Sequence, residues 1–292
     1  MNVIAVYELN FSWLVFLIMD KMLKIILLKF NMEEKMIIGL DVGNTNIVVG
    51  FIDNGEVVNV LRIATDSGRT SDEYKLLISE FMREEKIEKN LIEDFIISSV
   101  VPPLAPIFRA VSHKLIGRDA IVISFDMDLG IKFDVDEPGF TGTDRICNMF
   151  EAAYMFPNEN ACAIDFGTAT SFTVITKDRR FIGGPISIGI LTAQANLFRR
   201  TSQLPRIELL KPSSAIGKNT TEEMQSGLII GFGGLVDRLI ESIEGELGEP
   251  MKVVATGGIS HIMEGVSRRI EVFDKLLTLR GIYRIYEHVK KL

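Results

Sequence analysis

The sequence predicts an α/β protein built from two similar halves. Apolar stretches of strand length alternate with longer stretches of helical periodicity, as expected when helices cover a mixed sheet. Their order in the first half, βββαβαβ, begins again in the second half. The restart is also visible as a motif, because "DVG" at 41–43 and "DFG" at 165–167 both follow an apolar strand and lie 124 residues apart.

The first half opens with three strands, which are predicted over 36–41, 46–52 and 56–64. Between the last two, "DNG" is a strong signal for a tight hairpin turn. A helix is expected from about Ser71, with Thr70 or Ser71 as its N-cap and Glu73 in its first turn. The remaining elements are a buried strand that stops at two prolines, a helix and a short strand, at 94–103, 104–115 and 120–124.

The second half repeats this beginning. Strand-like segments are predicted at 162–167, 170–176 and 179–184, followed by helices at 190–200 and 221–246, a strand at 252–256 and a closing helix at 281–291. Pro157 and Asn158 mark a boundary between the halves. We interpret the repetition as a duplication that leaves a cleft between two related units.

Composition excludes several classes of protein. A formal net charge of −7 argues against a non-specific nucleic-acid binder, which needs a basic face. Cys147 and Cys162 are the only cysteines, without a CxxC motif, and are typical of buried thiols in a reducing compartment. His113, His261 and His288 have no metal-ligand spacing.

Residues 1–35 are interpreted as an extension that either precedes the native start or is disordered. The apolar run at 11–19 is closed by Asp20, whereas a spanning helix needs about 17–25 apolar residues. No basic start or small-residue cleavage site indicates a signal peptide. Met32 or Met36 is the expected true start, and a membrane anchor is the alternative.

The two D-x-G turns carry the first functional hypothesis. A tight turn between strands can direct backbone N–H groups and a hydroxyl outward, and such a nest binds anions, most often phosphate. The hydroxyls on offer are those of Thr45, Thr168 and Thr170. Asp41 and Asp165 would repel phosphate, so a cation is expected between them and a nucleotide. A plain β-turn is the alternative for either motif alone, but their matched positions favour two phosphate loops.

Two glycine-rich segments are further candidates for ligand contacts. "TGG" at 256–258 ends a strand and precedes a segment at 260–269 that is expected to be helical. A flat ring such as adenine could approach the backbone there, although a simple strand-to-helix turn is equally compatible. "GFGG" at 231–234 lies within a helical pattern and indicates close helix packing. The chain has no G-x-x-x-x-G-K-[ST] motif and is therefore no P-loop enzyme.

"FTGTDRICNMF" at 140–150 places an acid and a base at the start of a helix. The functional interpretation makes Asp144 an acceptor for a substrate hydroxyl proton and Arg145 a clamp for polar substrate groups. The alternative is a helix cap and a surface ion pair.

Taken in order and at these spacings, "DVGNT", "GTDR", "DFGTAT", "GKNT" and "TGG" resemble the motifs of type III pantothenate kinases. That family belongs to the acetate kinase, sugar kinase, Hsp70 and actin superfamily. The likeness runs from Met36 to near the end of the chain. It implies two ribonuclease-H-like βββαβαβ domains of the actin-like ATPase superfamily, at 36–154 and 155–292, with a nucleotide cleft between them.

The resemblance also implies an activity and partners. The enzyme would use ATP with Mg²⁺ to phosphorylate pantothenate to 4′-phosphopantothenate, the first step of coenzyme A synthesis. It would need a monovalent cation, K⁺ or NH₄⁺. A cytoplasmic homodimer is expected, with active sites near the subunit interface and with no nucleic-acid or membrane partner.

Site residues follow from the same resemblance. The first phosphate loop, which binds ATP, would be Asp41, Val42, Gly43, Asn44, Thr45, Asn46, Ile47 and Val48. Thr168 would also contact ATP, and Asp165 would bind the monovalent cation. Pantothenate would contact Gly142, Thr143, Asp144, Arg145 and Thr220, with Asp144 as the catalytic base.

The sequence departs from the family pattern in two places. Val135 aligns with a tyrosine that many members place against the substrate, and Ile188-Gly189 replaces a proline and a glycine. Both departures concern substrate contacts rather than the fold.

Two rival functions stay open: a superfamily kinase for another small hydroxylated substrate, and a catalytically silent regulatory homologue like the Bvg accessory factor. Four charged residues in one cleft, Asp41, Asp144, Arg145 and Asp165, argue against the silent homologue.

Overall fold

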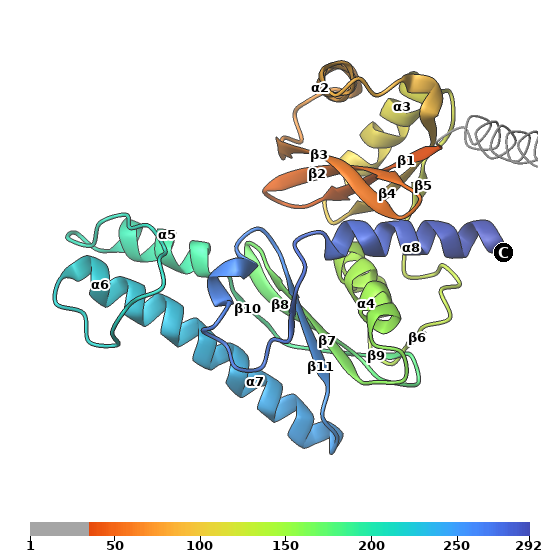
Figure 1. Cartoon of the computed structure of the whole chain (residues 1–292). Coiled ribbons are helices and arrows are strands. Elements are labelled where there is room, and N and C mark those ends of the chain that lie inside the picture. Colours follow the sequence, from red (N-terminus) through yellow and green to blue (C-terminus); the bar gives the residue numbers. More distant parts are fainter. Residues whose placement is uncertain (1–34) are drawn as a thin grey trace, which may run out of the picture. The chain divides into compact units, whose positions relative to one another are not determined.

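The computed structural model describes residues 35–292 (Figure 1). Residues 36–292 form one compact unit. The expectation that residues 1–35 are an extension lies outside the described residues, apart from Lys35. Within the described residues, no helix has both the length and the apolar character needed to cross a membrane.

The first sheet has five strands, β1 (Met36–Val42), β2 (Asn46–Asp53), β3 (Glu56–Ala64), β4 (Ile92–Ser99) and β5 (Ile121–Val122). Their order across the sheet is β3-β2-β1-β4-β5. The first three strands pair antiparallel, and β4 and β5 continue the sheet in parallel. Asn54 and Gly55 both have positive φ, as the predicted tight hairpin between β2 and β3 requires.

The second sheet contains β6 (Lys132–Phe133), β7 (Ala161–Phe166), β8 (Ala169–Ile175), β9 (Arg180–Gly183), β10 (Ile186–Ile188), β11 (Lys252–Thr256) and β12 (Val272–Phe273). Its central order, β9-β8-β7-β11-β12, repeats the order of the first sheet strand for strand. The pairing directions are repeated as well. The predicted restart of the fold is therefore confirmed. β6 is added beside β9, and β10 pairs with β8.

The helices are α2 (Ser71–Glu84), α3 (Leu104–Ile116), α4 (Thr143–Met155), α5 (Ile190–Arg200), α6 (Thr220–Gln225), α7 (Gly231–Leu247) and α8 (Leu277–Lys291). Short 3-10 segments lie at Lys89–Leu91, Pro138–Phe140 and Ser260–Met263. The single helix predicted over 221–246 is divided into α6 and α7 by a π-helical segment, Ser226–Ile230. After "TGG" the expected helix is only the 3-10 turn at 260–263.

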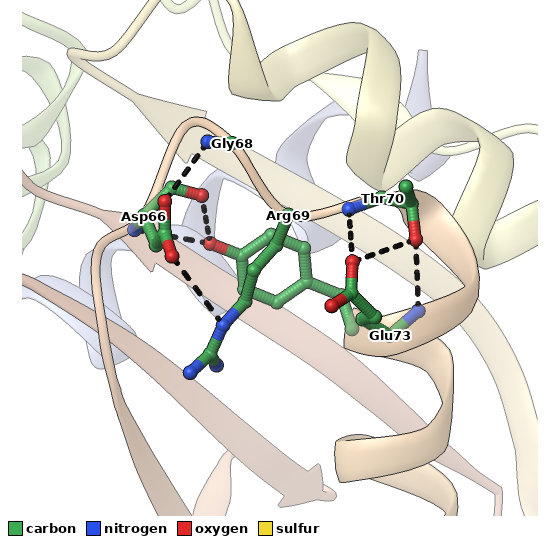
Figure 2. A network of polar contacts seen from close by, with 6 residues as sticks. Asp66, Gly68, Arg69, Thr70 and Glu73 are labelled. Carbon is green, nitrogen blue, oxygen red and sulfur yellow. Dashed lines mark hydrogen bonds and ion pairs between the residues drawn. The ribbon is translucent and has the colours of Figure 1, made fainter.

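The start of α2 is fixed by a capping box, shown in Figure 2. The Thr70 hydroxyl accepts from the Glu73 N–H, and the Glu73 carboxylate accepts from the Thr70 N–H at 2.7 Å. Just before it, the Tyr74 hydroxyl donates to the Asp66 carbonyl at 2.8 Å, and Gly68 N–H donates to the Asp66 carboxylate. The loop that follows β3 is thus held against α2.

Three hydrophobic clusters form the core. One joins the first sheet to α2 and α3, and another joins the second sheet to α7. The third cluster contains α4 and α8 together with residues of both sheets, such as Ile37 of β1 and Ala163 of β7. Because α4 and α8 share this third cluster, the start of α4 is placed beside both sheets. That is where "GTDR" lies.

Candidate active site

The first candidate phosphate loop is the turn between β1 and β2. Gly43 N–H donates to the Asn46 carbonyl at 3.0 Å and closes the turn. Thr65, the residue after β3, buttresses it: its hydroxyl donates to the Gly43 carbonyl at 2.6 Å and its N–H donates to the Thr45 carbonyl at 3.0 Å. Asn44 and Thr45 stay exposed at the tip. The loop is therefore rigid at its base and open at its tip.

The second candidate loop is the turn between β7 and β8. Gly167 N–H donates to the Ala169 carbonyl at 3.0 Å. Here the buttress is Thr192 of α5, whose hydroxyl donates to the Thr168 carbonyl at 2.7 Å. Gly189 N–H donates to the same carbonyl at 3.1 Å, and a side chain at Gly189 would collide with the loop backbone. The close approach of the two backbones explains the glycine at this position.

The two loops meet. The Thr45 and Thr168 hydroxyls lie 2.9 Å apart, although 123 residues separate them in the chain. Both residues are exposed. Thr170, the third hydroxyl considered from the sequence, is instead fully buried within β8, near the Ile188 carbonyl. Hydroxyls and glycine-containing turns of both halves are thus available to one ligand.

The start of α4 lies between the sheets. Gly142 is the N-cap and provides no side-chain cap, while the Asp144 carboxylate accepts from the Arg145 N–H at 2.7 Å. Thr143 accepts from the Ser98 hydroxyl of β4 at 2.9 Å. "GTDR" is therefore the first turn of a helix, as predicted.

Arg145 extends toward the second sheet. Its Nε donates to the Thr173 hydroxyl at 3.1 Å and its Nη2 donates to the Phe172 carbonyl at 2.8 Å. The guanidinium also lies over the Phe181 ring, 5.3 Å from its centroid. Two of the five guanidinium N–H groups are thus engaged by β8. Arg145 is anchored in the fold in addition to facing the site.

Three carboxylates share this region. Burial raises the pKa of Asp41 to about 8, with further contributions from the charges of Asp144 and Asp165, against the opposing charge of Arg62. Burial likewise raises the pKa of Asp165 to about 7, again assisted by Asp144. The pKa of Asp144 is raised by burial too, although the Arg145 N–H opposes the shift. Asp144 therefore lies close enough to both loop aspartates to influence each of them.

Such a cluster fits a cation bound together with a phosphate ligand. Among residues 35–292, no three or more His, Cys, Asp or Glu side chains are grouped to hold a metal ion by themselves. Mg²⁺ is commonly held by one or two carboxylates plus substrate phosphates rather than by a protein cage. A cation near Asp41 and Asp165 would also favour their ionised forms, which burial disfavours.

Two of the residues expected at the site are less directly connected to it. Thr220 is the exposed first residue of α6, a helix capped by Asn219, whose side chain accepts from the Glu222 N–H at 3.0 Å. Val135 follows β6 and packs beside Gly183 of β9. In the part of the chain that the structure describes, no hydrogen bond joins the Thr220 side chain to Asp144 or to either loop. Its role in substrate binding stays a prediction.

Several supporting residues were not foreseen from the sequence. Thr65 and Thr192 buttress the two loops, and Ser98 supports the start of α4. Gly257, the first glycine of "TGG", has φ of +95° and lies so close to β7 that a Cβ there would be 2.5 Å from the Asp165 carboxylate. The position of Gly257 directly after the buried strand β11 was the available signal for that residue, but glycines also occur in ordinary turns. Ser98 lies within β4 and Thr192 within α5, and no local pattern marks either one.

Solved structures share the fold. A Campylobacter jejuni protein assigned to the Baf family of transcriptional activators has a TM-score of 0.54 at 16% identity, covering 87% of this chain and 100% of that chain. MreB 5 of Spiroplasma citri, bound to AMPPNP, has a TM-score of 0.52 at 10% identity, covering 88% of this chain and 97% of that chain. At these identities the likeness is one of fold, and the predicted actin-like α/β architecture is confirmed.

Sequence comparison is more specific. The family described as type III pantothenate kinase matches residues 37–242. A type III pantothenate kinase of Desulfatibacillum aliphaticivorans is 42% identical over 87% of this chain and 99% of its own length. A second, from Geobacter sulfurreducens, is 37% identical over 86% of this chain and 98% of its own. The matched residues include both loops and the start of α4, and the chain belongs to the type III pantothenate kinase family.

Proposed function

We propose that this protein transfers the γ-phosphoryl group of ATP to the terminal hydroxyl of pantothenate. The product is 4′-phosphopantothenate, and the reaction is the first step of coenzyme A synthesis. Family membership supports this activity. The structural observation that supports it best is the position of Asp144, whose charge acts on an aspartate of each loop.

In this proposal the two loops hold the ATP phosphates. Turn N–H groups and hydroxyls are suitable ligands for phosphate oxygens, and glycines at 43 and 167 allow close approach. The 2.9 Å contact between Thr45 and Thr168 supports a shared ligand for both loops. Residues 41–48 and Thr168 are accordingly proposed as the ATP contacts.

Asp144 is the proposed base. Phosphoryl transfer depends mainly on positioning and on charge stabilisation, and the carboxylate would orient the attacking hydroxyl and accept its proton. The new P–O bond forms to the pantothenate oxygen as the bond between the γ-phosphorus and the β–γ bridging oxygen breaks, leaving ADP. The ligand-free pKa of Asp144 is raised by burial. Positive charge near the carboxylate would oppose this shift and favour the ionised form that accepts a proton.

Pantothenate is a carboxylate with several polar groups, and Arg145 is the proposed clamp for them. The guanidinium N–H groups not taken by β8 are suited to such a ligand. Gly142, Thr143 and Thr220 are proposed as further contacts. A matching test is Arg145→Ala, which should raise the pantothenate concentration at half-maximal rate and, because Arg145 also anchors the start of α4 to β8, should lower turnover as well.

Two cations are part of the proposal. Mg²⁺ would neutralise phosphate charge, and a monovalent cation, K⁺ or NH₄⁺, would lie near Asp165. The support is electrostatic, since two aspartates with raised pKa values would lie beside the ATP phosphates in this proposal. Turnover that is equal in potassium and in sodium-only buffers would contradict the role given to Asp165.

We also propose a homodimer. β10 and α5 follow each other in the chain and expose large apolar side chains, among them Ile186 at 64%, Ile188 at 45% and Leu191 at 47%. Clustered exposed apolar residues are typical of an interaction surface. Ile186→Lys should shift the molar mass from that of a dimer toward that of a monomer in light scattering. A monomeric wild-type chain would contradict the proposal. A cytoplasmic location stays a prediction.

The decisive experiment is a coupled assay of ADP release with MgATP and four acceptors: pantothenate, glucose, glycerol and acetate. Turnover with pantothenate alone is expected. Turnover with another acceptor would favour a different kinase of the superfamily. No turnover with any acceptor, despite a folded protein that binds ATP, would favour a silent homologue.

A further inference from the structure

Asp144 lies between two anchors that join the start of α4 to opposite sheets. The residue before it, Thr143, accepts a hydrogen bond from Ser98 at the end of β4 in the first sheet, at 2.9 Å. The residue after it, Arg145, donates to Thr173 and to the Phe172 carbonyl of β8 in the second sheet. The carboxylate is therefore held from both sides along the chain.

The anchor on the first sheet depends on a buried hydroxyl. Ser98 has no exposed surface and follows three buried apolar residues of β4, 95–97. A hydroxyl removed from water is costly unless it is hydrogen-bonded, and here the Ser98 donor is satisfied by Thr143. In the parallel register, Ser98 is also the partner of Asp41 on β1. Ser98 thus lies beside one loop aspartate and contacts the helix that carries the base.

The start of α4 needs such a support. Its N-cap is Gly142, so no cap side chain fixes the first turn. The Asp144 carboxylate accepts from the backbone N–H of the adjacent Arg145. The hydrogen bond from Ser98 to Thr143 therefore supports this first turn from outside the helix.

We propose that Ser98 is a positioning residue for the phosphoryl transfer: by holding Thr143 it keeps the Asp144 carboxylate where the substrate hydroxyl is activated. This inference rests on the base role proposed for Asp144. Ser98 itself touches no reacting atom. In this proposal its effect on turnover passes through Asp144, and this is what distinguishes positioning from an effect through the neighbouring Asp41 or from a general contribution to folding.

The test is a double-mutant cycle with Ser98→Ala and Asp144→Asn, measured as turnover at saturating MgATP and pantothenate. A displacement of about 1 Å at a reacting group can cost about a hundredfold. Ser98→Ala should therefore lower turnover by about tenfold to a hundredfold in the wild-type background. In the Asp144→Asn background it should lower turnover less than about twofold, because the group that it positions is gone.

The matched control is Ser112→Ala. Ser112 is also a fully buried serine, and its hydroxyl donates to the Arg118 carbonyl at 2.7 Å, but it lies on α3 away from the carboxylates. It should change turnover by less than about twofold while lowering the melting temperature to a similar extent. Should Ser98→Ala not fold, Ser98→Cys retains a weak donor and should give an intermediate loss of turnover.

The outcomes separate the two proposals. An equal fall caused by Ser98→Ala in both backgrounds would overturn positioning and leave the base role intact. If Ser98→Ala keeps the turnover of the wild type while Asp144→Asn is inactive, positioning by Ser98 is likewise overturned and the base role of Asp144 is left intact. Normal turnover of Asp144→Asn would overturn the base role and, with it, the action of Ser98 through that residue.

Discussion

The two candidate phosphate loops are related by the repeated sheet order, yet they are built differently. The first turn closes from Gly43 to Asn46, whereas the second closes from Gly167 to Ala169 and is one residue shorter. This explains why the aspartates are 124 residues apart while the two hydroxyls that meet are separated by 123. The same strand frame therefore supports two turns of different length that present a hydroxyl to the same place.

The strand beside each loop aspartate shows a second difference. Asp41 is paired with Ser98 on β4, and Asp165 is paired with Thr256 on β11. In the first half this neighbouring hydroxyl reaches across to α4. In the second half the chain continues into Gly257, whose backbone packs directly on Asp165. The first half is thus connected by a hydrogen bond to the helix that carries the proposed base, whereas in the second half the chain packs on the loop aspartate itself.

The largest effect on turnover is expected for Asp144, whose charge acts on the aspartates of both loops. Asp144→Asn preserves shape but removes the basic oxygen, and general-base contributions are on the order of a hundredfold to ten-thousandfold. Turnover should fall by about that range, with ATP affinity and melting temperature nearly unchanged. Asp72→Asn, at the first turn of α2, is the control and should keep normal turnover. Near-normal turnover of Asp144→Asn would make "GTDR" a helix start without a catalytic base.

Separate substitution of Asp41 and Asp165 by asparagine would test whether the two loops have different roles. Asp41→Asn should lower turnover by about a hundredfold or more, in the range seen when one preorganised electrostatic group is lost. Its response to added potassium should remain. Asp165→Asn should lose turnover less severely and should lose the potassium response. Titrations with potassium chloride at constant ionic strength measure both the turnover and its response to potassium. Identical titration curves for the two variants would show that Asp41 and Asp165 do not have separate roles in binding the two cations.

The loop aspartates should also make stability depend on pH. Their pKa values rise from 3.8 unfolded to about 8 for Asp41 and about 7 for Asp165, so the folded protein retains protons that the unfolded chain releases. Their contribution to the free energy of unfolding is complete below pH 4 and is lost as the pH rises to 7 or 8.

The corresponding measurement is the melting temperature of ligand-free protein between pH 5 and 8. Asp165→Asn should remove the part of the decline that ends near pH 7, and Asp41→Asn should remove the part that continues to about pH 8. Both variants should therefore gain relative to wild type as the pH rises. A difference from wild type that stays constant across this range would contradict the raised pKa values.

The smallest expected effects are those of the two buttresses. Thr65→Val and Thr192→Val each remove one hydroxyl-to-carbonyl hydrogen bond, worth roughly 0.5–1.5 kcal/mol. Thr65→Val should raise the KM for ATP by about fivefold. Thr192→Val should have less effect, because Gly189 still donates to the Thr168 carbonyl.

Thr176→Val is the matched control for this pair. Its hydroxyl contacts the Arg180 carbonyl in the turn between β8 and β9, away from both loops. It should leave the KM for ATP unchanged. A larger rise in the KM for ATP with Thr192→Val than with Thr65→Val would contradict the conclusion that the second loop is the better supported of the two.

Much of the fold could be predicted because its signals are local. Apolar strands that end in D-x-G turns, the hairpin at 53–55 and the capping box at Thr70 are each specified within a few residues. The prediction of a helix after "TGG" was wrong because it relied on local spacing alone. Apolar spacing there resembles a helix, but Gly265 has φ of +65° and Asp237 accepts from Ser267 and Arg268, which turns the chain away from helical geometry.

The short strands β6, β10 and β12 were not predicted. Two or three residues carry too little periodicity to distinguish a strand from a loop. Their positions are decided by pairing, since β6 joins β9 from a distance of 48 residues in sequence, as in Lys132 with Arg180. The π-helical segment at 226–230 was not predicted either, and its residues Ser226, Leu228 and Ile229 are buried.

The sequence by itself determined which chemistry is present: two glycine-containing turns with hydroxyls, an aspartate before each, and an acid at a helix start. Tertiary structure alone decided which of these groups meet. The contact of Thr45 with Thr168 and the support of Thr143 by Ser98 join residues 123 and 45 positions apart. Such contacts depend on how two sheets pack around α4 and α8, and no local pattern of residues encodes a distance between separate elements.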